Sequence, residues 1–330
     1  MRAFVVTHYG PDGLEAADVP TPVVGPRDVL INIRAASINP LDKMVRNGEF
    51  KQLIKYERPF ILGHDLAGVI TQVGSGGRGF EVGDEVYARP RDLRIGSFAE
   101  QIAVHADDVA LKPTSLSFEE AAAVPLVALA AWQALVEVAA VQPGQKVLVH
   151  AGAGGLGSTV IQVAKHLGAH VATTAHTNDL DKARALGADE VIDFTQQDFA
   201  DVLSGYDVVL DSLGPASLEK SLTVLERGGL AISVVGPPDP GFATQLGKPL
   251  LKPVMAVLSH KIRRLARKLG VRYSFFFMRA SGAQLTTLRA LYDSGTLRPV
   301  LDRAFPFDRT LDAMAYVEQG KANGKIVVTR

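Results

Sequence analysis

A run of small residues in the middle of the chain is the clearest sign of chemistry in the sequence. The apolar segment KVLVHA (146–151) leads into the turn AGAGGLG (151–157), and helical spacing begins directly after it. Strand, glycine turn and helix in this order hold a diphosphate, because backbone N–H groups can approach it and the helix N-terminus favours negative charge. The turn predicts a dinucleotide site; in the alternative, its glycines only let the helix pack closely on the strand. The predicted binding residues are Gly152, Ala153, Gly154, Gly155, Leu156 and Gly157.

The residues that end the next apolar strand indicate which dinucleotide binds. An acid at this point would hold the adenosine ribose hydroxyls and repel a 2′-phosphate. The segment VATTAHTNDLDK (171–182) instead offers hydroxyls and cations at Thr173, Thr174, His176 and Lys182. These groups can accept a phosphate, so we expect NADPH rather than NADH. In the alternative, Lys182 only belongs to a solvated helix face.

The elements that position these residues alternate between strands and helices from Lys146 onward. Continuous apolar strands separated by helical segments indicate an α/β fold with a doubly wound parallel sheet. Up to about residue 120, short β-branched runs separated by turn residues favour a partly closed antiparallel barrel. Short β runs return after Gly295. We therefore expect the C-terminal segment to rejoin the first domain.

Composition limits the classes of partner and compartment. A chain of 330 residues suggests two domains, and its formal net charge of zero gives no field that favours nucleic acid. The absence of cysteine excludes disulfides and thiolate zinc sites and fits a reducing compartment. The longest apolar tract (121–141) is interrupted by Pro125, Gln133 and Glu137, and the N-terminus lacks a signal-peptide pattern. We expect a cytoplasmic protein without stable membrane insertion.

Several strings stand in a characteristic order along the chain. They are GHDLAGVITQVG (63–74), GDEVYA (83–88), GSFAEQIAV (96–104), AAWQAL (130–135), AGAGGLGS (151–158), LGADEVIDF (186–194) and GKIVV (324–328). This ordered set resembles the medium-chain dehydrogenase/reductase superfamily over essentially the whole chain. The resemblance implies a GroES-like catalytic domain at 1–123 and 296–330, a Rossmann domain at 124–295, NADPH in the cleft between them, and a homodimer.

The same resemblance bears on metal use. Alcohol dehydrogenases of the superfamily hold catalytic zinc with a cysteine, a histidine and a second cysteine. The matching positions here are Asn39, His64 and an aliphatic segment. One imidazole cannot hold zinc, which takes three protein ligands in a catalytic site. The chain therefore resembles the zinc-free quinone oxidoreductase and enone reductase branch, which implies no metal site and hydride transfer to a quinone or an α,β-unsaturated carbonyl.

The resemblance also implies roles for individual residues. The segment SINPLDKMVRNGEF (37–50) is similar to the one that lines the nicotinamide pocket. It places Asn39 near the nicotinamide, Asp42 beside it or as a brace of the loop, and Lys43 where it could orient a carbonyl oxygen. The alternatives are a turn residue for Asn39 and a surface lysine for Lys43. Further expected cofactor contacts are Leu213, Val235, Gly236, Phe276, Phe277 and Lys325, with core packing as the alternative for the phenylalanine side chains.

Two other functions and one segment stay open. Many relatives carry a tyrosine and a threonine near the nicotinamide, whereas this chain has Met44 and Ala130 at such positions. A non-enzymatic NADPH-binding sensor or structural protein therefore remains an alternative, as does a zinc alcohol dehydrogenase. The segment SHKIRRLARKLG (259–270) predicts an amphipathic helix that covers an edge of the cleft; binding of anionic lipid or of a partner is the alternative.

Overall fold

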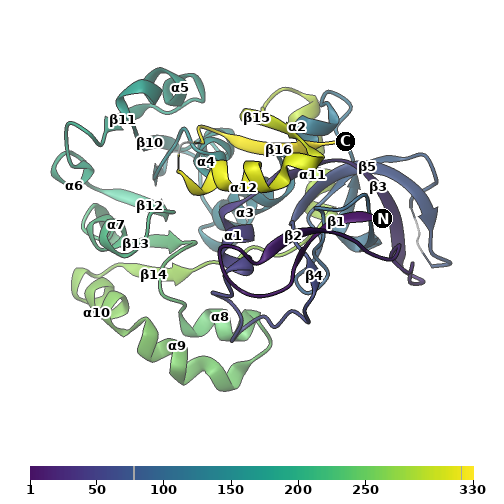
Figure 1. The fold of residues 1–330 in the computed structure, drawn as a ribbon. Coiled ribbons are helices and arrows are strands. Elements are labelled where there is room, and N and C mark those ends of the chain that lie inside the picture. Colours follow the sequence, from purple (N-terminus) through teal and green to yellow (C-terminus); the bar gives the residue numbers. More distant parts are fainter. Residues whose placement is uncertain (77–78, 321) are drawn as a thin grey trace. The chain divides into compact units, whose positions relative to one another are not determined.

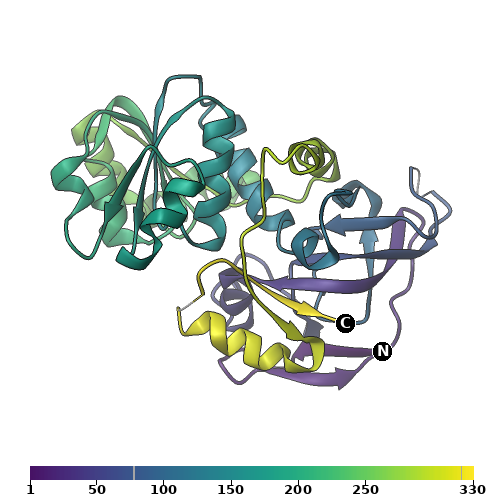
Figure 2. The same ribbon diagram turned by 90° about the horizontal axis from the view of Figure 1, so that it is seen from above.

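The computed structural model describes residues 1–76, 79–320 and 322–330, which form two compact units. Unit 1 comprises Met1–Leu129 and Arg279–Arg330, and unit 2 comprises Ala130–Met278. Figures 1 and 2 show the ribbon in two views. Strands dominate unit 1, whereas strands and helices alternate along unit 2, so the change of pattern at Lys146 in the sequence is reproduced in the structure.

Unit 2 is built on a six-stranded parallel sheet. Its strands in spatial order are β11 (Glu190–Asp193), β10 (His170–Ala175), β9 (Lys146–Val149), β12 (Tyr206–Asp211), β13 (Leu225–Ser233) and β14 (Arg272–Phe275). The order reverses direction at β9, as in dinucleotide-binding sheets, and the ligand site of such sheets lies at the carboxyl ends of the strands. The predicted doubly wound parallel sheet is confirmed.

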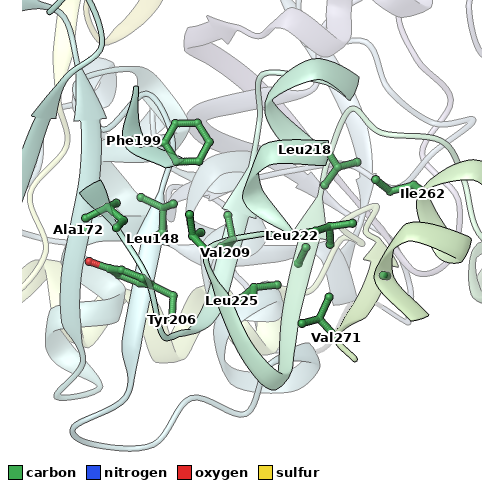
Figure 3. Packing of buried hydrophobic residues seen from close by; sticks show 14 of the residues in the cluster. Leu148, Ala172, Phe199, Tyr206, Val209, Leu218, Leu222, Leu225, Ile262 and Val271 are labelled. Atoms are coloured by element: carbon green, nitrogen blue, oxygen red, sulfur yellow. The ribbon is translucent and has the colours of Figure 1, made fainter. Parts of the chain in front are cut away.

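Helices accompany the strands of unit 2, and several of them bury apolar side chains in the core of the unit. They are a π-helical turn (Gln133–Val138), α4 (Gly155–His166), α5 (Leu180–Ala185), α6 (Phe199–Val202), α7 (Pro215–Ser221), α8 (Pro240–Gln245), α9 (Lys252–Leu258) and α10 (His260–Leu269). Figure 3 shows part of the resulting core, in which Leu148 of β9 and Leu222 after α7 lie in one cluster with Ile262 of α10. The apolar strands are thus covered, as their continuous hydrophobic runs predict.

Unit 1 contains two sheets. The larger runs in the order β15 (Leu301–Pro306), β16 (Lys325–Thr329), β3 (Asp28–Ile38), β5 (Asp65–Val73), β6 (Glu85–Ala88) and β8 (Val109–Leu111), and β7 (Gln101–His105) also pairs with β3. The smaller consists of β2 (Leu14–Asp18), β1 (Arg2–Val6) and β4 (Phe60–Ile61). Because β16 pairs with β3 in antiparallel register, the C-terminal strand does rejoin the N-terminal segment.

The second boundary between the units lies after Met278, earlier than the boundary at residue 295 expected from the sequence, because one of the helices of unit 1 begins soon after it. The helices of unit 1 are α1 (Pro40–Arg46), α2 (Phe118–Ala122), α3 (Pro125–Trp132, which runs across the first boundary), α11 (Gly282–Asp293) and α12 (Thr310–Glu318). We expected residues up to 295 in the Rossmann domain, but α11 packs on β8. Tyr87 Oη donates to Leu285 O (2.7 Å), and a Cβ on Gly282 would lie 2.3 Å from Val109 O. Glycine there lets the helix approach the strand closely.

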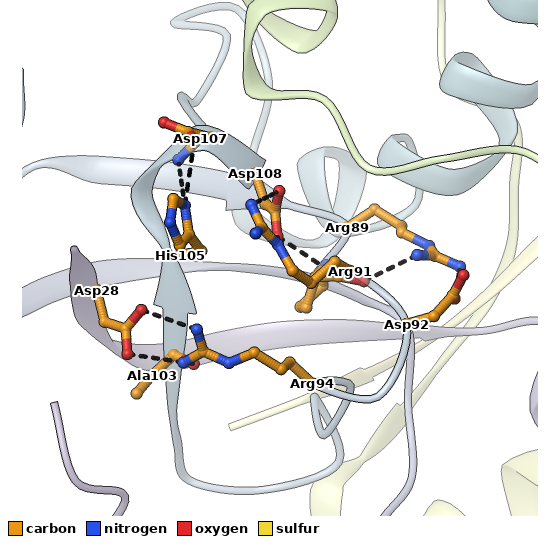
Figure 4. Close-up of polar contacts among 10 residues, drawn as sticks. Asp28, Arg89, Arg91, Asp92, Arg94, Ala103, His105, Asp107 and Asp108 are labelled. Atoms are coloured by element: carbon orange, nitrogen blue, oxygen red, sulfur yellow. Dashed lines mark hydrogen bonds and ion pairs between the residues drawn. The ribbon is translucent and has the colours of Figure 1, made fainter. Parts of the chain in front are cut away.

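Ion pairs hold the loop that follows β6. Arg94 donates to both carboxylate oxygens of Asp28, at 2.9 and 2.7 Å, and Arg91 donates to both oxygens of Asp108, at 2.7 and 2.8 Å (Figure 4). The hydrogen bond from Arg94 lowers the pKa of Asp28. Paired N–H donors fix geometry as well as adding energy, so the loop is tied to β3 and to the turn before β8.

The apolar tract at 121–141 forms short buried helices within the two units. Leu129 and Leu135 in this tract have no exposed surface. No helix among the described residues is long and apolar enough to cross a membrane.

Candidate functional site

The glycine turn of unit 2 connects the end of β9 to the start of α4. Gly152 N donates to Thr174 O and Gly154 N donates to Ala151 O, both at 3.0 Å. Ala151 has a φ of 53°, in the left-handed region that few non-glycine residues adopt. A Cβ on Gly152 would lie 2.1 Å from Thr173 Oγ1, and one on Gly157 would lie 2.2 Å from Ala151 O. The turn therefore requires glycine at both positions.

The start of α4 leaves backbone donors available. Gly154 is the N-cap, and no side chain caps the helix. The N–H groups of the first turn of a helix have no intrahelical acceptor, and the helix dipole makes this end attractive to anions. Gly155, Leu156 and Gly157 occupy that turn. These uncapped N–H groups, which follow a turn of small residues, fit a diphosphate.

The two threonines at the end of β10 are buried and hold the turn. Thr173 Oγ1 donates to Val149 O (2.6 Å), and Thr174 Oγ1 accepts from Ala151 N (3.1 Å). We expected these hydroxyls to meet a cofactor phosphate, but their partners in the structure belong to β9 and the turn. The sequence did not distinguish these roles, because a buried and an exposed threonine look alike in a strand.

His150 is buried beside the same turn and hydrogen-bonds to Thr174, which in turn accepts from Ala151 N. Its Nε2 lies 2.8 Å from Ser221 Oγ, and its Nδ1 lies 3.3 Å from Thr174 Oγ1. Ser221 Oγ itself donates to Ser217 O, so it accepts from Nε2–H, and Nδ1 is left as an acceptor. Burial lowers the pKa of His150 to about 4, so the ring is neutral at pH 7. Sequence analysis missed this residue.

The end of β10 carries no acid. His176 follows the strand, is exposed, and accepts from Asn178 N at the start of a short 3-10 turn (Thr177–Asp179). Lys182 lies on the half-buried side of α5. A 2′-phosphate would meet no carboxylate at the position after the strand, so both residues stay predicted contacts.

The remaining expected cofactor residues of unit 2 follow the carboxyl ends of three other strands of the sheet. Leu213 comes after β12, Val235 and Gly236 after β13, and Phe276 and Phe277 after β14. Because the strands are parallel, all of these ends lie at the same edge of the sheet as the glycine turn. The topology thus brings the predicted residues of this unit to one edge.

Hydrogen bonds connect the backbone and the side chains at this edge of the sheet. Gly236 N donates to Ser233 Oγ (2.8 Å), which in turn donates to Asp211 Oδ2 (2.7 Å). Burial raises the pKa of Asp211. Phe276 is buried, which favours the alternative of core packing for its side chain. Gln245 Nε2 donates to Phe277 O.

Unit 1 contains a buried polar cluster, which we call the Lys325 cluster: Ser37, Asn39, Asp65 and Lys325. Asp65 Oδ2 accepts from Ser37 Oγ and from Asn39 Nδ2, both at 2.9 Å, and lies 3.4 Å from Lys325 Nζ. Lys325 Nζ also donates to Asn39 Oδ1. The Lys325 side chain is 6% exposed, and burial lowers its pKa although Asp65 opposes that shift.

Strand pairing explains why this cluster forms. Ser37 is the register partner of Asp65, and Ile38, just before Asn39, is the register partner of Ile326. Three segments distant in sequence thus place their polar residues at one end of the sheet. Sequence analysis missed Asp65 and Ser37, although GHDLAG contained the former. The expected contact of Lys325 with cofactor phosphates stays a prediction; its partners in unit 1 are Asn39 and Asp65.

Asp42 joins α1 to His64. Asp42 Oδ2 accepts from Asn39 N (2.7 Å), and Asp42 Oδ1 lies 2.6 Å from His64 Nδ1. Both residues are fully buried, so Asp42 braces the start of the helix. Lys43, one residue on, is half-buried, and among the described residues its ammonium has no hydrogen-bond or ion-pair partner. Of the three predicted catalytic residues, only Lys43 has an uncommitted polar group.

Within the described ranges, no group of three His, Asp or Glu side chains is arranged to hold a metal ion. His64, at the position that matches a zinc ligand, is hydrogen-bonded to Asp42 instead.

Comparison with known proteins identifies the family. A zinc-binding dehydrogenase family model matches residues 186–328, and an alcohol dehydrogenase GroES-like domain model matches residues 25–114 of unit 1. The 2-methylene-furan-3-one reductase of Solanum lycopersicum is 37% identical over 99% of this chain and 79% of its own length. The chloroplastic NADPH-dependent alkenal/one oxidoreductase of Arabidopsis thaliana is 35% identical with the same coverage.

A solved structure agrees with these relatives. The quinone oxidoreductase from Coxiella burnetii superposes with a TM-score of 0.87 at 29% identity, covering 100% of this chain and 99% of that one. The ordered motifs, the Rossmann-type sheet and the GroES-like unit are all accounted for by these matches. The chain therefore belongs to the medium-chain dehydrogenase/reductase superfamily, in its zinc-free branch of quinone and enone reductases.

Proposed function

We propose that this protein is an NADPH-dependent reductase that transfers a hydride to quinones or α,β-unsaturated carbonyls without zinc. The observation that carries the proposal is the glycine turn at the carboxyl edge of the sheet. Gly152 and Gly157 let the turn pack closely against β10 and its own backbone, the first turn of α4 has no side-chain cap, and the end of β10 beside it has no acid. Relatives named alkenal/one oxidoreductase and quinone oxidoreductase support the two acceptor classes.

The residues present fit NADPH. The first-turn N–H groups at Gly155, Leu156 and Gly157 would bind the diphosphate. His176 and Lys182 would bind the 2′-phosphate, and the backbone at Val235 and Phe277 would hold the nicotinamide end. When bound, NADPH supplies the hydride. Everything else in the reaction depends on side chains that position the acceptor and stabilise the charge that develops on it.

The acceptor needs little activation. An enone takes up the hydride at its β-carbon and a proton at its α-carbon, and the charge that develops on the carbonyl oxygen needs only hydrogen-bond donors. We propose that Lys43 donates to this oxygen and that solvent supplies the proton. The Lys325 cluster fixes the Asn39 side chain, and Asp42 fixes the start of α1, so Asn39 and Asp42 are positioning residues.

An assay of NADPH consumption tests the function. The purified chain is mixed with NADPH and either 9,10-phenanthrenequinone or a medium-chain enone, and the nicotinamide absorbance is followed. We expect oxidation of NADPH with at least one acceptor. Tight NADPH binding without oxidation by either would favour a non-enzymatic sensor or structural protein, and one tightly held zinc per chain would favour an alcohol dehydrogenase.

Cofactor choice has its own test at the end of β10. His176→Asp places a carboxylate where it would repel a 2′-phosphate and bind ribose hydroxyls, while keeping an oxygen that can cap the 3-10 turn. We expect the preference for NADPH over NADH, measured as a ratio of kcat/KM, to fall about tenfold or more, since loss of one charge-assisted contact is worth about 1.4 kcal/mol or more. His166→Asp, at the other end of α4, is the control and should leave the ratio unchanged.

We also propose a homodimer located in the cytoplasm. The lack of cysteine fits a reducing compartment. Light scattering after size-exclusion chromatography tests the dimer, and fractionation of cells that express the chain tests the compartment. Recovery in an organelle would contradict the second point; some relatives carry chloroplastic or mitochondrial names.

A further inference from the structure

One stretch of unit 2 carries a strong local charge in a chain whose formal net charge is zero. Residues 240–270 contain seven lysines and arginines and no aspartate or glutamate. The cations are Lys248, Lys252, Lys261, Arg263, Arg264, Arg267 and Lys268. Nothing in the proposed reduction uses them.

The basic helix α10 turns its apolar side inward. Ile262 (Figure 3) and Ala266 are buried in the core of unit 2, and the predicted amphipathic helix is confirmed. Its cations therefore lie on the outer side. Arg264, Arg267 and Lys268, with His260, line an open depression of about 490 Å³.

The neighbouring segment exposes aliphatic side chains. Leu250 is 91% exposed, and on α9 Val254, Val257 and Leu258 are 55%, 75% and 57% exposed. Positions 254, 257 and 258 share one face of the helix because they are three and four residues apart. Scattered surface hydrophobics are ordinary, but an exposed aliphatic group of this kind beside a basic helix marks an interaction surface. We call Leu250–Leu258 together with α10 the α9–α10 surface.

We propose that the α9–α10 surface docks on an anionic lipid bilayer. Its aliphatic side chains would enter the boundary between headgroups and acyl chains, and the cations of α10 would contact lipid phosphates. The presence of exposed aliphatic side chains and cations on one surface favours a lipid bilayer over other partners. Nucleic acid would satisfy the cations but leave Val257 and Leu258 in water. A second copy, paired through a two-fold axis, would bring the same cations face to face.

Three of the cations of α10 are not neutralised by ion pairs within the part of unit 2 that the structure describes. Lys261 forms an ion pair with Glu219 (2.6 Å), so its charge is already balanced. Arg267 Nε donates only to Arg263 O, at 3.3 Å, one turn back in the same helix. No ion pair involves Arg264, Arg267 or Lys268 among the described residues. These three are the cations to test.

Sedimentation with lipid vesicles tests the proposal on the full chain. Vesicles of phosphatidylcholine with phosphatidylglycerol should bind the protein at low salt, and pure phosphatidylcholine vesicles should not. Arg264→Gln, Arg267→Gln and Lys268→Gln together should weaken binding about a hundredfold, since each cation near an anionic surface is worth about fivefold. Val257→Gln with Leu258→Gln should weaken it as well, and raised salt should weaken binding of the unaltered chain.

A control removes equal charge elsewhere. Arg27, Arg34 and Arg309 are exposed in unit 1. Changing all three to Gln in one variant should leave vesicle binding unchanged. Equal losses in this control and in the α10 variant would overturn the proposal. So would binding of a DNA duplex with no vesicle binding, or a shift from dimer to monomer in Val257→Gln with Leu258→Gln without an effect on vesicle binding. NADPH is absent throughout, so a negative result leaves the proposed reductase activity standing.

Discussion

At the scale of single residues, the least expected feature is an ammonium group buried in unit 1. Lys325 Nζ meets Asp65 Oδ2 at 3.4 Å and donates to Asn39 Oδ1. Three more donors reach the Asp65 carboxylate: Ser37 Oγ and Asn39 Nδ2, both at 2.9 Å, and Leu126 N at 2.8 Å. Burying a charge is costly unless it is paired and hydrogen-bonded. Each member of the Lys325 cluster therefore depends on the others.

A double-mutant cycle tests this dependence. Asp65→Asn or Lys325→Met alone should lower the free energy of unfolding by about 3–5 kcal/mol, because each leaves one charge buried without its counterpart. The double variant should lose clearly less than the sum of the two. Chemical denaturation measures all three, and strictly additive losses would contradict a coupled cluster.

His150 makes the stability of unit 2 depend on pH. Its pKa is lowered to about 4 in the folded chain by burial, against about 6.5 when unfolded. The unfolded state therefore binds the proton first as pH falls. The stabilisation is complete above about pH 6.5 and is lost progressively between pH 6.5 and 4.

The expected size of this effect is about 3 kcal/mol, from a difference of about 2.5 pKa units. His150→Gln should flatten the fall in unfolding free energy between pH 7.5 and 5, as measured by denaturant titration. His166→Gln replaces an exposed histidine and should leave the slope as it is. An equal slope in the His150 variant and the unaltered chain would rule out this origin.

At the scale of elements, the sequence predicted the glycine turn, the parallel strands and helix α10 correctly. Each is encoded locally: glycines where a Cβ does not fit, apolar runs where both faces are covered, and helical spacing of Ile262, Leu265 and Leu269. What it could not predict depends on partners distant in sequence. The hydroxyl of Thr173 reaches Val149 O only because β10 lies beside β9.

The glycine turn makes a direct prediction. Gly157→Ala would place a Cβ 2.2 Å from Ala151 O and 2.8 Å from Ala151 C, which are backbone atoms that cannot move aside easily. We expect a loss of about 1–3 kcal/mol in the free energy of unfolding, as for other overpacked sites. We also expect NADPH affinity to fall about tenfold or more in calorimetry. Ser158→Ala, the next residue, adds no atom and should bind NADPH nearly normally.

At the scale of the whole molecule, the ordered motifs identified the family, but the division of the chain was only partly predictable. The sequence assigned residues up to 295, and so α11, to the Rossmann domain because short β runs return only after Gly295. The structure places it in unit 1, where Gly282 permits contact with Val109 O and Leu285 O accepts from Tyr87. These contacts join α11 to strands distant in sequence, and they leave no periodic pattern in the sequence of the helix or of the strands.

The central claim is that NADPH transfers a hydride to the β-carbon of the acceptor. The most direct measurement uses NADPH deuterated at nicotinamide C4, on each face in turn, with a medium-chain enone as acceptor and mass spectrometry of the product. With one of the two labelled faces, the account predicts one deuterium at the former β-carbon and an unlabelled proton at the α-carbon. Unlabelled product from both faces, or NADPH bound but unconsumed with enone and quinone alike, would contradict it.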